Sequence, residues 1–210
     1  GKLRVSGNTR MRSERIVAIA GLPTGKVFDP EDITEARTRL RRSGVFSSIS
    51  MVEASVISAG NTLDIEAELI ESKPRRFGFG AELSTEEGLG VSGFWLHRNL
   101  LGGGERLRIG GEVTGIGGMT GGNDYELTLA FSRPATFNAD TDFSGDAAVS
   151  ILGEPNFSSD RAALEAGVRR YATPEREYTL GVGYSAANTV DTFGARSYRI
   201  LSLPLSAEFD

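Results

Sequence analysis

Apolar residues alternate with small or polar residues along the last two thirds of the chain, and this period of two excludes amphipathic helices there. The segment 125–131, which reads YELTLAF, is the clearest example. The alternating segments lie at 76–83, 90–100, 106–113, 125–131, 143–151, 164–169, 178–185 and 201–209. Glycine, asparagine, aspartate and proline gather between them. The pattern predicts eight antiparallel strands of about ten residues each, arranged as a barrel or part of one.

The alternation leaves open which face of the predicted sheet meets water. A soluble barrel buries its apolar face inside, whereas an outer-membrane barrel turns that face outward to lipid and keeps a polar interior. Strands of about ten residues match the length that crosses a bilayer when tilted. The face opposite the apolar one is small and polar, which suits a wide interior filled with water. Both features favour the membrane barrel.

Residues 1–74 have a different character, with only six of the 27 glycines and two aromatic residues. Helical periodicity predicts one helix from Ser13 to Gly21 and a second from Asp29-Pro30 to Gly44. Strands are expected at 3–6, 46–56 and 62–72. The order β-α-α-β-β predicts an α+β domain at 1–74, followed by a barrel domain at 75–210. Pro74 marks the boundary.

Composition excludes several classes of function. The chain has no cysteine, so disulfides, thiolate metal sites and a cysteine nucleophile are excluded. His97 is the only histidine, which excludes a multi-histidine metal centre within the chain. The net charge of −5 lacks the basic footprint of a nucleic-acid-binding domain. We therefore expect no nucleic-acid partner.

Two glycine-rich segments approach nucleotide-binding motifs without matching them. Residues 88–93 read G-x-G-x-x-G, but strand-like residues follow where a dinucleotide site needs a helix. Residues 21–26 lack one residue of a P-loop, and Val27 replaces its serine or threonine. His97 has no accompanying G-x-S-x-G sequence. We expect no enzyme activity, no catalytic or metal-binding residue and no cofactor.

Four arginines gather near the C-terminal end of the second predicted helix, at positions 37, 39, 41 and 42. Cations are favourable there because of the helix dipole. The favoured interpretation is a solvated helix end, and the alternative is a site for phosphate or lipid headgroups.

The first domain resembles the POTRA domain. The resemblance rests on residues 5–8, which read VSGN, and residues 40–46, which read LRRSGVF, within the β-α-α-β-β order. It implies binding of unfolded polypeptides or partner subunits by strand addition to an exposed sheet edge. The expected docking residues are Ser48, Ile49, Ser50 and Met51. Gly7, Gly44 and Phe46 are interpreted as residues that build the fold.

The second domain resembles the bacterial outer-membrane assembly-factor superfamily, whose members join POTRA domains to a barrel. Residues 98–107 read RNLLGGGERL and are similar to a hairpin motif of that superfamily. The motif residues are Arg98, Asn99, Leu100, Gly102 and Gly104. Residues 132–134, SRP, are most similar to its translocation-and-assembly-module (TamA) branch. The resemblance implies a fragment: the membrane-proximal POTRA domain with the first half of a sixteen-stranded barrel.

By this resemblance, the protein would be an assembly and insertion factor for outer-membrane β-proteins, especially autotransporters. It would lie in the bacterial outer membrane with its POTRA domain in the periplasm. The implied partners are unfolded outer-membrane or autotransporter proteins, a periplasmic or inner-membrane-anchored partner, and the lipid bilayer. A client strand would pair at a seam formed by the first barrel strand: Arg76, Phe77, Gly78, Phe79, Gly80, Ala81, Glu82 and Leu83. Gly78 and Gly80 would either loosen this strand or relieve crowding inside a curved barrel.

Two other functions stay open. One is a two-partner secretion pore, which also combines POTRA domains with a sixteen-stranded barrel. The other is an autonomous eight-stranded barrel that binds an apolar ligand. For the isolated half-barrel, we expect closure of the sheet on itself in preference to pairing of two copies.

Overall fold

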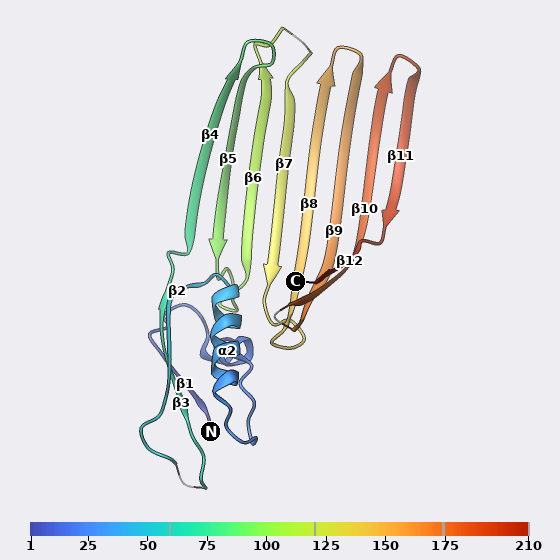
Figure 1. Ribbon diagram of the computed structural model, residues 1–210. Helices are drawn as coiled ribbons and strands as arrows, with labels where there is room; N and C mark the ends of the chain where they lie inside the picture. Colours follow the sequence, from blue (N-terminus) through green and yellow to red (C-terminus); the bar gives the residue numbers. More distant parts are fainter. Residues whose placement is uncertain (59, 120, 174, 210) are drawn as a thin grey trace. The chain divides into compact units, whose positions relative to one another are not determined.

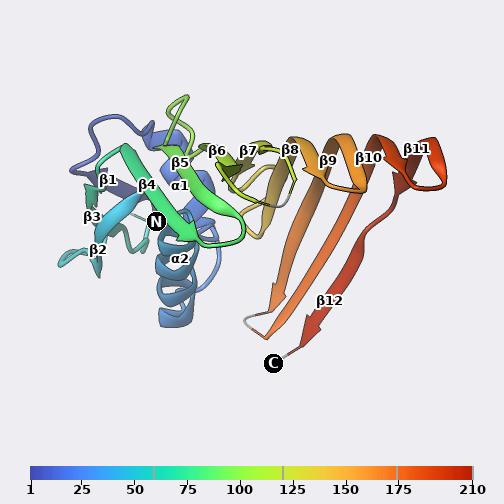
Figure 2. The same cartoon turned by 90° about the horizontal axis from the view of Figure 1, so that it is seen from above.

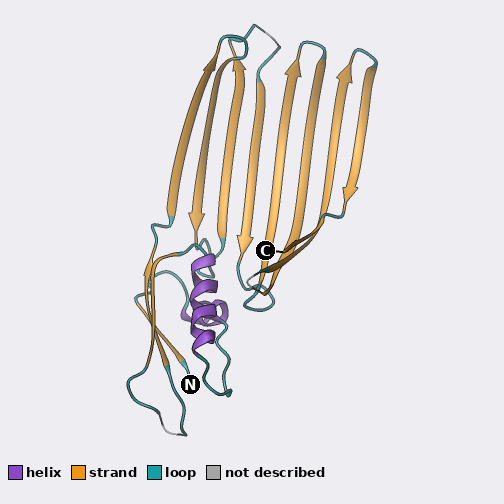
Figure 3. Ribbon diagram, viewed as in Figure 1, coloured by secondary structure: helices purple, strands orange, loops and turns teal. Residues whose placement is uncertain are grey.

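The computed structural model describes residues 1–58, 60–119, 121–173 and 175–209, which fold as two units. The first unit comprises Gly1–Pro74 together with two later segments, Arg98–Arg106 and Arg133–Asp142. The other strands form the second unit (Figures 1 and 3). Asp210, the last residue of the expected barrel domain, lies outside the described residues. The expected division at Pro74 stays a prediction, and the two later segments are an addition to it.

The first unit contains a three-stranded sheet and two helices in the predicted order β-α-α-β-β. Its elements are β1 (Leu3–Ser6), α1 (Ser13–Ala20), α2 (Pro30–Arg42), β2 (Phe46–Glu53) and β3 (Ile65–Glu71). The strand order is β1-β3-β2, with β1 parallel and β2 antiparallel to the central strand β3. Both β2 and β3 are shorter than predicted, by three residues each at the ends that face the loop between them, and β3 also ends one residue early, at Glu71.

Local sequence signals set the helix ends in this unit. The Asp29 carboxylate accepts a hydrogen bond from the Glu31 amide at 2.9 Å and caps α2, with Pro30 in the first turn. Gly21 follows α1 and Gly44 follows α2, and both have the left-handed backbone that glycine adopts without strain. The helix predictions are confirmed at both ends.

Side chains of both helices, β2 and β3 form the core. The helices contribute Ile16, Ile19 and Leu40, which are fully buried, and β3 contributes alternate residues that include Leu69. Glu71 closes the loop before α1, because its carboxylate accepts hydrogen bonds from the amides of Thr9, Arg10 and Met11, each at 2.9 Å. Burial opposes the charged form, but these hydrogen bonds hold the pKa of Glu71 below its usual value.

The second unit is built on one antiparallel sheet. Its strands are β4 (Arg75–Ser84), β5 (Gly88–Arg98), β6 (Arg106–Ile116), β7 (Asp124–Arg133), β8 (Thr141–Glu154), β9 (Phe157–Thr173), β10 (Arg176–Asp191), β11 (Gly194–Ser202) and β12 (Leu205–Phe209). Neighbours in sequence are neighbours in the sheet from β4 to β11, and β12 also pairs with β10. Seen from above, these strands follow one another in a single open layer (Figure 2).

The last predicted strand, 201–209, differs from the observed one. The chain enters β11 earlier, at Gly194, and Pro204 separates β11 from β12. Proline has no amide hydrogen for the ladder, although its carbonyl still accepts a hydrogen bond from the Gly181 amide at 2.9 Å. β11 pairs with residues 183–191 of β10 and β12 with residues 176–180, so together they line one edge of β10. The apolar–polar alternation of 201–209 continues through Pro204, although the strand is interrupted there. The proline should have predicted this interruption.

The sheet is open, so the expected closure on itself is wrong. Among the described residues, β4 ends the strand order on one side and β11 on the other, and no pairing joins them. Closing the sheet would bring the polar side chains of one face into a narrow interior. Arg108, Arg161, Glu165 and Arg169 lie on alternating positions of that face, and crowding them opposes closure.

The apolar face of this sheet is exposed. Its large exposed side chains include Phe77, Phe79, Leu127, Leu129, Val149, Ile151, Leu164, Leu180, Val182, Tyr184, Leu201 and Leu205. Glycine, serine and charged residues occupy the alternating positions. An apolar surface of this extent exceeds what a water-soluble monomer tolerates. No helix among the described residues is long and apolar enough to cross a bilayer.

Candidate functional site

The free edge of β4 presents backbone groups in an apolar setting. The Arg98 amide donates to the Pro74 carbonyl at 2.7 Å, and the β4–β5 register continues from there without a shift. Residues in an antiparallel pair alternate between hydrogen-bonded and free positions, so the even-numbered residues of β4 bond to β5. The odd-numbered ones direct their N–H and C=O groups to the open edge. Within the predicted seam these are Phe77, Phe79, Ala81 and Leu83, and Arg75 precedes them on the same side.

The predicted seam residues therefore divide into two groups of four. Arg76, Gly78, Gly80 and Glu82 hold β4 to β5, and the other four are available to a further strand. Phe79 is 88% exposed, compared with 62% for Phe77 and 82% for Leu83. A strand that adds here gains hydrogen bonds that water supplies poorly near an apolar surface.

The structure also distinguishes between the two roles expected for Gly78 and Gly80. A Cβ atom on Gly78 would lie 2.2 Å from Cε1 of Phe94, and one on Gly80 would lie 2.8 Å from Oγ of Ser92. The Phe94 ring itself lies 4.5 Å from the Arg108 guanidinium carbon, a cation–π distance. These contacts favour relief of crowding as the reason for both glycines. Sequence reasoning missed Phe94, because the sequence of one strand does not show which residue of the neighbouring strand lies opposite.

The POTRA edge at β2 is also open, but the four predicted docking residues differ in what they offer. The Ala54 amide donates to the Asp64 carbonyl at 2.9 Å, so Ser50 and Ser48 form hydrogen-bonded pairs with β3. The free backbone groups belong to Ile49 and Met51. The Met51 side chain is 4% exposed and lies in the core, so it can contribute only its backbone.

Arg37 of α2 already occupies one of those groups. Its Nη2 donates to the Met51 carbonyl oxygen at 3.2 Å. Its Nε is buried and has no hydrogen-bond partner among the described residues. The Met51 carbonyl, one of the free acceptors of the β2 edge, is thus already hydrogen-bonded to a side chain of α2.

The family hairpin motif folds as a tight turn between β5 and β6. Asn99 adopts a left-handed backbone with φ 60°, and its side-chain oxygen accepts a hydrogen bond from the Gly104 amide at 3.0 Å. Gly102 and Gly104 have φ of 80° and 88°, where a side chain is strained. Leu100 donates its amide to the Glu105 carbonyl at 3.0 Å, and the Glu105 carboxylate accepts from Gly103 at 2.9 Å. Glu105 is buried and completes the turn, although it was not among the five motif residues named from the sequence.

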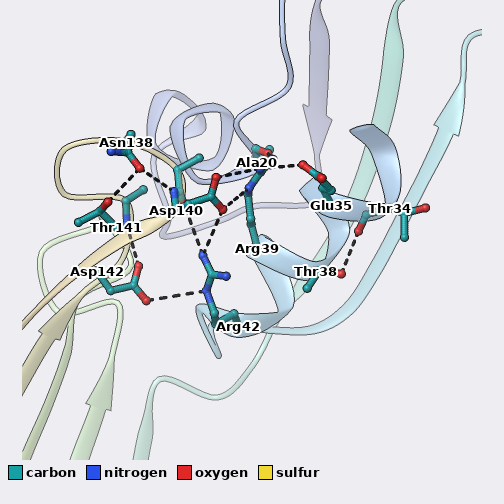
Figure 4. A network of polar contacts seen from close by, with 12 residues as sticks. Ala20, Thr34, Glu35, Thr38, Arg39, Arg42, Asn138, Asp140, Thr141 and Asp142 are labelled. Carbon is teal, nitrogen blue, oxygen red and sulfur yellow. Dashed lines mark hydrogen bonds and ion pairs between the residues drawn. The ribbon is translucent and has the colours of Figure 1, made fainter. Parts of the chain in front are cut away.

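Another polar contact within the first unit joins α2 to the turn before β8 (Figure 4). The sequence did not indicate it. Arg39 forms two parallel hydrogen bonds to Asp140, from Nε at 2.7 Å and from Nη2 at 2.9 Å. Its side chain is 14% exposed. Burial opposes charge here, but the bonds to Asp140 raise the pKa of Arg39. Arg42 donates to the Ala139 carbonyl at 3.3 Å and lies 3.9 Å from the Asp142 carboxylate.

Arg15 of α1 binds both turns at once. It donates to the carbonyl oxygens of Pro134 at 2.7 Å, Ala135 at 3.3 Å and Gly103 at 3.2 Å. Burial and the nearby positive charge of Arg133 lower the pKa of Arg15. We name the contacts from α1 and α2 to the segments 98–106 and 133–142 the turn contact. They explain why these segments belong to the first unit.

The turn contact, together with the hydrogen bond from Arg37 to Met51, corrects the interpretation of the arginine cluster as a solvated helix end. Arg41 is exposed as expected, but Arg37, Arg39 and Arg42 each bind backbone or carboxylate oxygens. The distant aspartates at 140 and 142 carried no local signal of this pairing. Among the described residues, no group of three or more histidines, aspartates and glutamates is placed to hold a metal ion.

Comparison with known proteins adds two findings. Residues 1–69 match the POTRA family, described as a surface antigen variable number repeat. No curated protein sequence matches the chain. The chain also resembles solved structures at low sequence identity, which bears on the fold alone.

Three solved structures illustrate this likeness. BamA from Haemophilus ducreyi lacking POTRA domains 1–3 has a TM-score of 0.64 and 16% identity, over 98% of this chain and 42% of that one. CdiB from Acinetobacter baumannii has a TM-score of 0.70 and 9% identity, over 98% and 41%. CdiB from Escherichia coli has a TM-score of 0.66 and 13% identity, over 100% and 41%.

The chain spans about two fifths of the length of these structures. Both parts of the predicted fold are confirmed by the match and the likeness together. Residues 1–69 form a POTRA domain, and the chain as a whole has the fold of a POTRA domain joined to part of an antiparallel barrel.

Proposed function

We propose that the protein takes part in assembly or secretion of outer-membrane proteins, and specifically that it inserts β-proteins by pairing a client strand with the free edge of β4. It acts from the outer membrane with its POTRA domain in the periplasm, and without a cofactor. The observation that carries the proposal is the set of free backbone groups at Phe77, Phe79, Ala81 and Leu83 within an exposed apolar face.

The physical reason is the poor solvation of peptide groups in lipid. Every N–H and C=O group left unpaired at the β4 edge is costly in hydrocarbon, and so is every such group of an unfolded client strand. Pairing the two satisfies both sets at once. Because backbone groups make the bonds, the edge accepts strands of many sequences.

The POTRA domain has a docking role in this proposal. Its β2 edge receives an extended segment of a client or of a periplasmic or inner-membrane-anchored partner through the backbone of Ile49 and Met51. Autotransporters are the client class we propose, because residues 132–134 are most similar to the TamA branch of the superfamily.

Site-specific photo-crosslinking tests the proposal. A photoreactive amino acid replaces Phe79 in one variant and Leu180 in a matched variant, in cells that assemble a tagged outer-membrane β-protein. Both positions are exposed on the apolar face, but β10 is paired on both sides whereas β4 has a free edge. We expect capture of the tagged client from position 79 and only background capture from position 180.

Equal capture from both positions would contradict strand pairing at β4. The fate of the client molecules that are not crosslinked distinguishes assembly from the two-partner secretion alternative. A client under assembly stays in the membrane fraction, whereas a secreted client appears in the medium.

A further inference from the structure

Arg37 of α2 contacts the open β2 edge at Met51, and one of its N–H groups makes no hydrogen bond within the described residues. Its Nη2 donates to the Met51 carbonyl at 3.2 Å, and its Nε is buried without a partner among the described residues. A buried guanidinium N–H that makes no hydrogen bond is costly, so native structures rarely leave one unpaired. An incoming group that accepts this hydrogen bond is therefore favoured.

The surroundings of Arg37 do not supply such a group. Glu53 lies two residues beyond Met51 on the same side of β2, and it forms no ion pair within the described part of the chain. Arg39, two residues along α2, is paired with Glu35 and Asp140. Arg37 is thus a cation at a free sheet edge, and no carboxylate of the described residues lies within 4.0 Å of it.

We infer that the β2 edge selects extended segments that carry an acidic side chain, whose carboxylate binds Arg37 as the strand adds to β2. The inference rests on the proposed docking role of this edge and names the chemistry of its partner. The added strand takes the free backbone groups of Ile49 and Met51. The guanidinium then turns from the Met51 carbonyl to the carboxylate, which accepts two parallel N–H donors.

This exchange explains why an arginine serves the edge better than a lysine would. The planar guanidinium can hold the Met51 carbonyl in the free protein and a bidentate carboxylate in the complex. In the free protein it also covers one of the acceptors that make an open edge prone to unwanted pairing. A strand without an acidic residue would have to displace Arg37 and leave it without a replacement partner.

Peptide binding to the detergent-solubilised full chain tests the inference. The probes are fluorescent nine-residue peptides of alternating threonine and valine, with aspartate, asparagine or lysine at the centre, and anisotropy reports their affinity. We expect the aspartate peptide to bind about fivefold more tightly than the asparagine peptide, and the lysine peptide most weakly.

Variants of Arg37 separate charge from geometry. Arg37→Gln is expected to abolish the preference for aspartate while leaving the asparagine peptide bound at least as well, because the Met51 carbonyl becomes free. Arg37→Lys is expected to keep part of the preference. Arg41→Gln is the matched control, since Arg41 is exposed on the same helix, and it should leave all three affinities unchanged.

A single thiol locates the bound peptide. Because the chain has no cysteine, Ser50→Cys provides one reactive group on β2. With copper phenanthroline as the oxidant, a thiol-bearing aspartate peptide should form a disulfide there, and the same substitution at Ser185 in β10 should give none.

The outcomes are distinct. Capture at β2 with equal affinity for aspartate and asparagine peptides would overturn the role of Arg37 and leave edge docking intact. Failure of all three peptides to bind would overturn edge docking itself, and the inference with it. A preference that survives Arg37→Gln would assign the selectivity to another residue and also contradict the inference.

Discussion

Strands β3 and β10 show the same alternation of apolar with small or polar residues, but they bury opposite faces. In β3 the apolar residues are inside, and Leu69 is 1% exposed. In β10 it is Gly181 and Gly183 that are buried, whereas Leu180 is 57% exposed. The two helices of the first unit cover the apolar face of β3, and β10 has no such layer. Alternation of apolar and polar residues therefore defines the two faces of a strand. Whether the apolar face becomes part of a core depends on whether other elements, such as helices, cover it.

The largest expected effect comes from truncating the same residue type in both strands. Leu69→Ala should lower the free energy of unfolding of the first unit by about 2–5 kcal/mol, because it removes buried methyl groups and leaves a cavity. Leu180→Ala should leave that unit unaffected. Hydrogen exchange of the α1 and α2 amides in denaturant measures both. Equal losses would mean that the contrast between β3 and β10 is wrong.

The next effect concerns the turn contact. Arg39→Met removes a bidentate partner of Asp140 and should destabilise the first unit by about 1.5–3 kcal/mol, the range for hydrogen bonds to charged groups. Arg41→Met should change it little, because Arg41 is exposed. Amide exchange in segment 133–142 should rise only in the first variant. If both variants behave alike, Arg39 does not hold this turn.

A third prediction concerns the glycines of β4. Gly78→Ala forces the Phe94 ring away from its place and should cost about 1–3 kcal/mol of sheet stability, as overpacking does. Phe94→Leu in the same chain should recover part of the loss. Gly111→Ala in β6 is the control, because its added Cβ would meet no atom closer than 3.7 Å. Heat denaturation of the sheet in detergent, followed by circular dichroism, reports the difference.

The smallest expected effect depends on pH. The pKa of Glu71 is lowered in the folded state, so its contribution is fully present above its unfolded pKa and is lost as pH falls through the folded value. The first unit should thus lose about 1 kcal/mol through this group as the pH falls from roughly 5 through the lowered pKa of Glu71. Glu71→Gln should be less stable at pH 7 and should flatten that pH dependence. An unchanged pH profile in the variant would assign the acid sensitivity to other carboxylates.

Local signals in the sequence predicted much of the fold. Asp29-Pro30 and Gly44 placed α2 correctly, because capping residues mark where a helix begins and ends. Period-two alternation placed most of the strands in the same way. The exception at Pro204 is instructive, since the apolar pattern continued through a residue that cannot complete the ladder.

The candidate sites were predicted less completely, for a physical reason. The side of a strand to which a residue directs its N–H and C=O groups depends on the register with the neighbouring strand. The sequence therefore could not show which alternate residues of Arg76–Leu83 bond to β5. Long-range partners were equally hidden: Arg39 and Asp140 are a hundred and one residues apart. Arg37 looked like a solvated cation because nothing in α2 reveals the position of the β2 edge.

The turn contact has a consequence for how the sequence can change in length. The segments 98–106 and 133–142 are both fixed to the helices of the first unit, so Leu107–Ser132 is a hairpin tethered at its two ends. Removing one residue from β6 or β7 would turn every later side chain of that strand to the opposite face. Because neither tether can slide to compensate, deletions in these strands should be tolerated only in pairs. Single insertions and deletions should gather instead between β6 and β7, at 117–119 and 121–123, where no strand register is shifted.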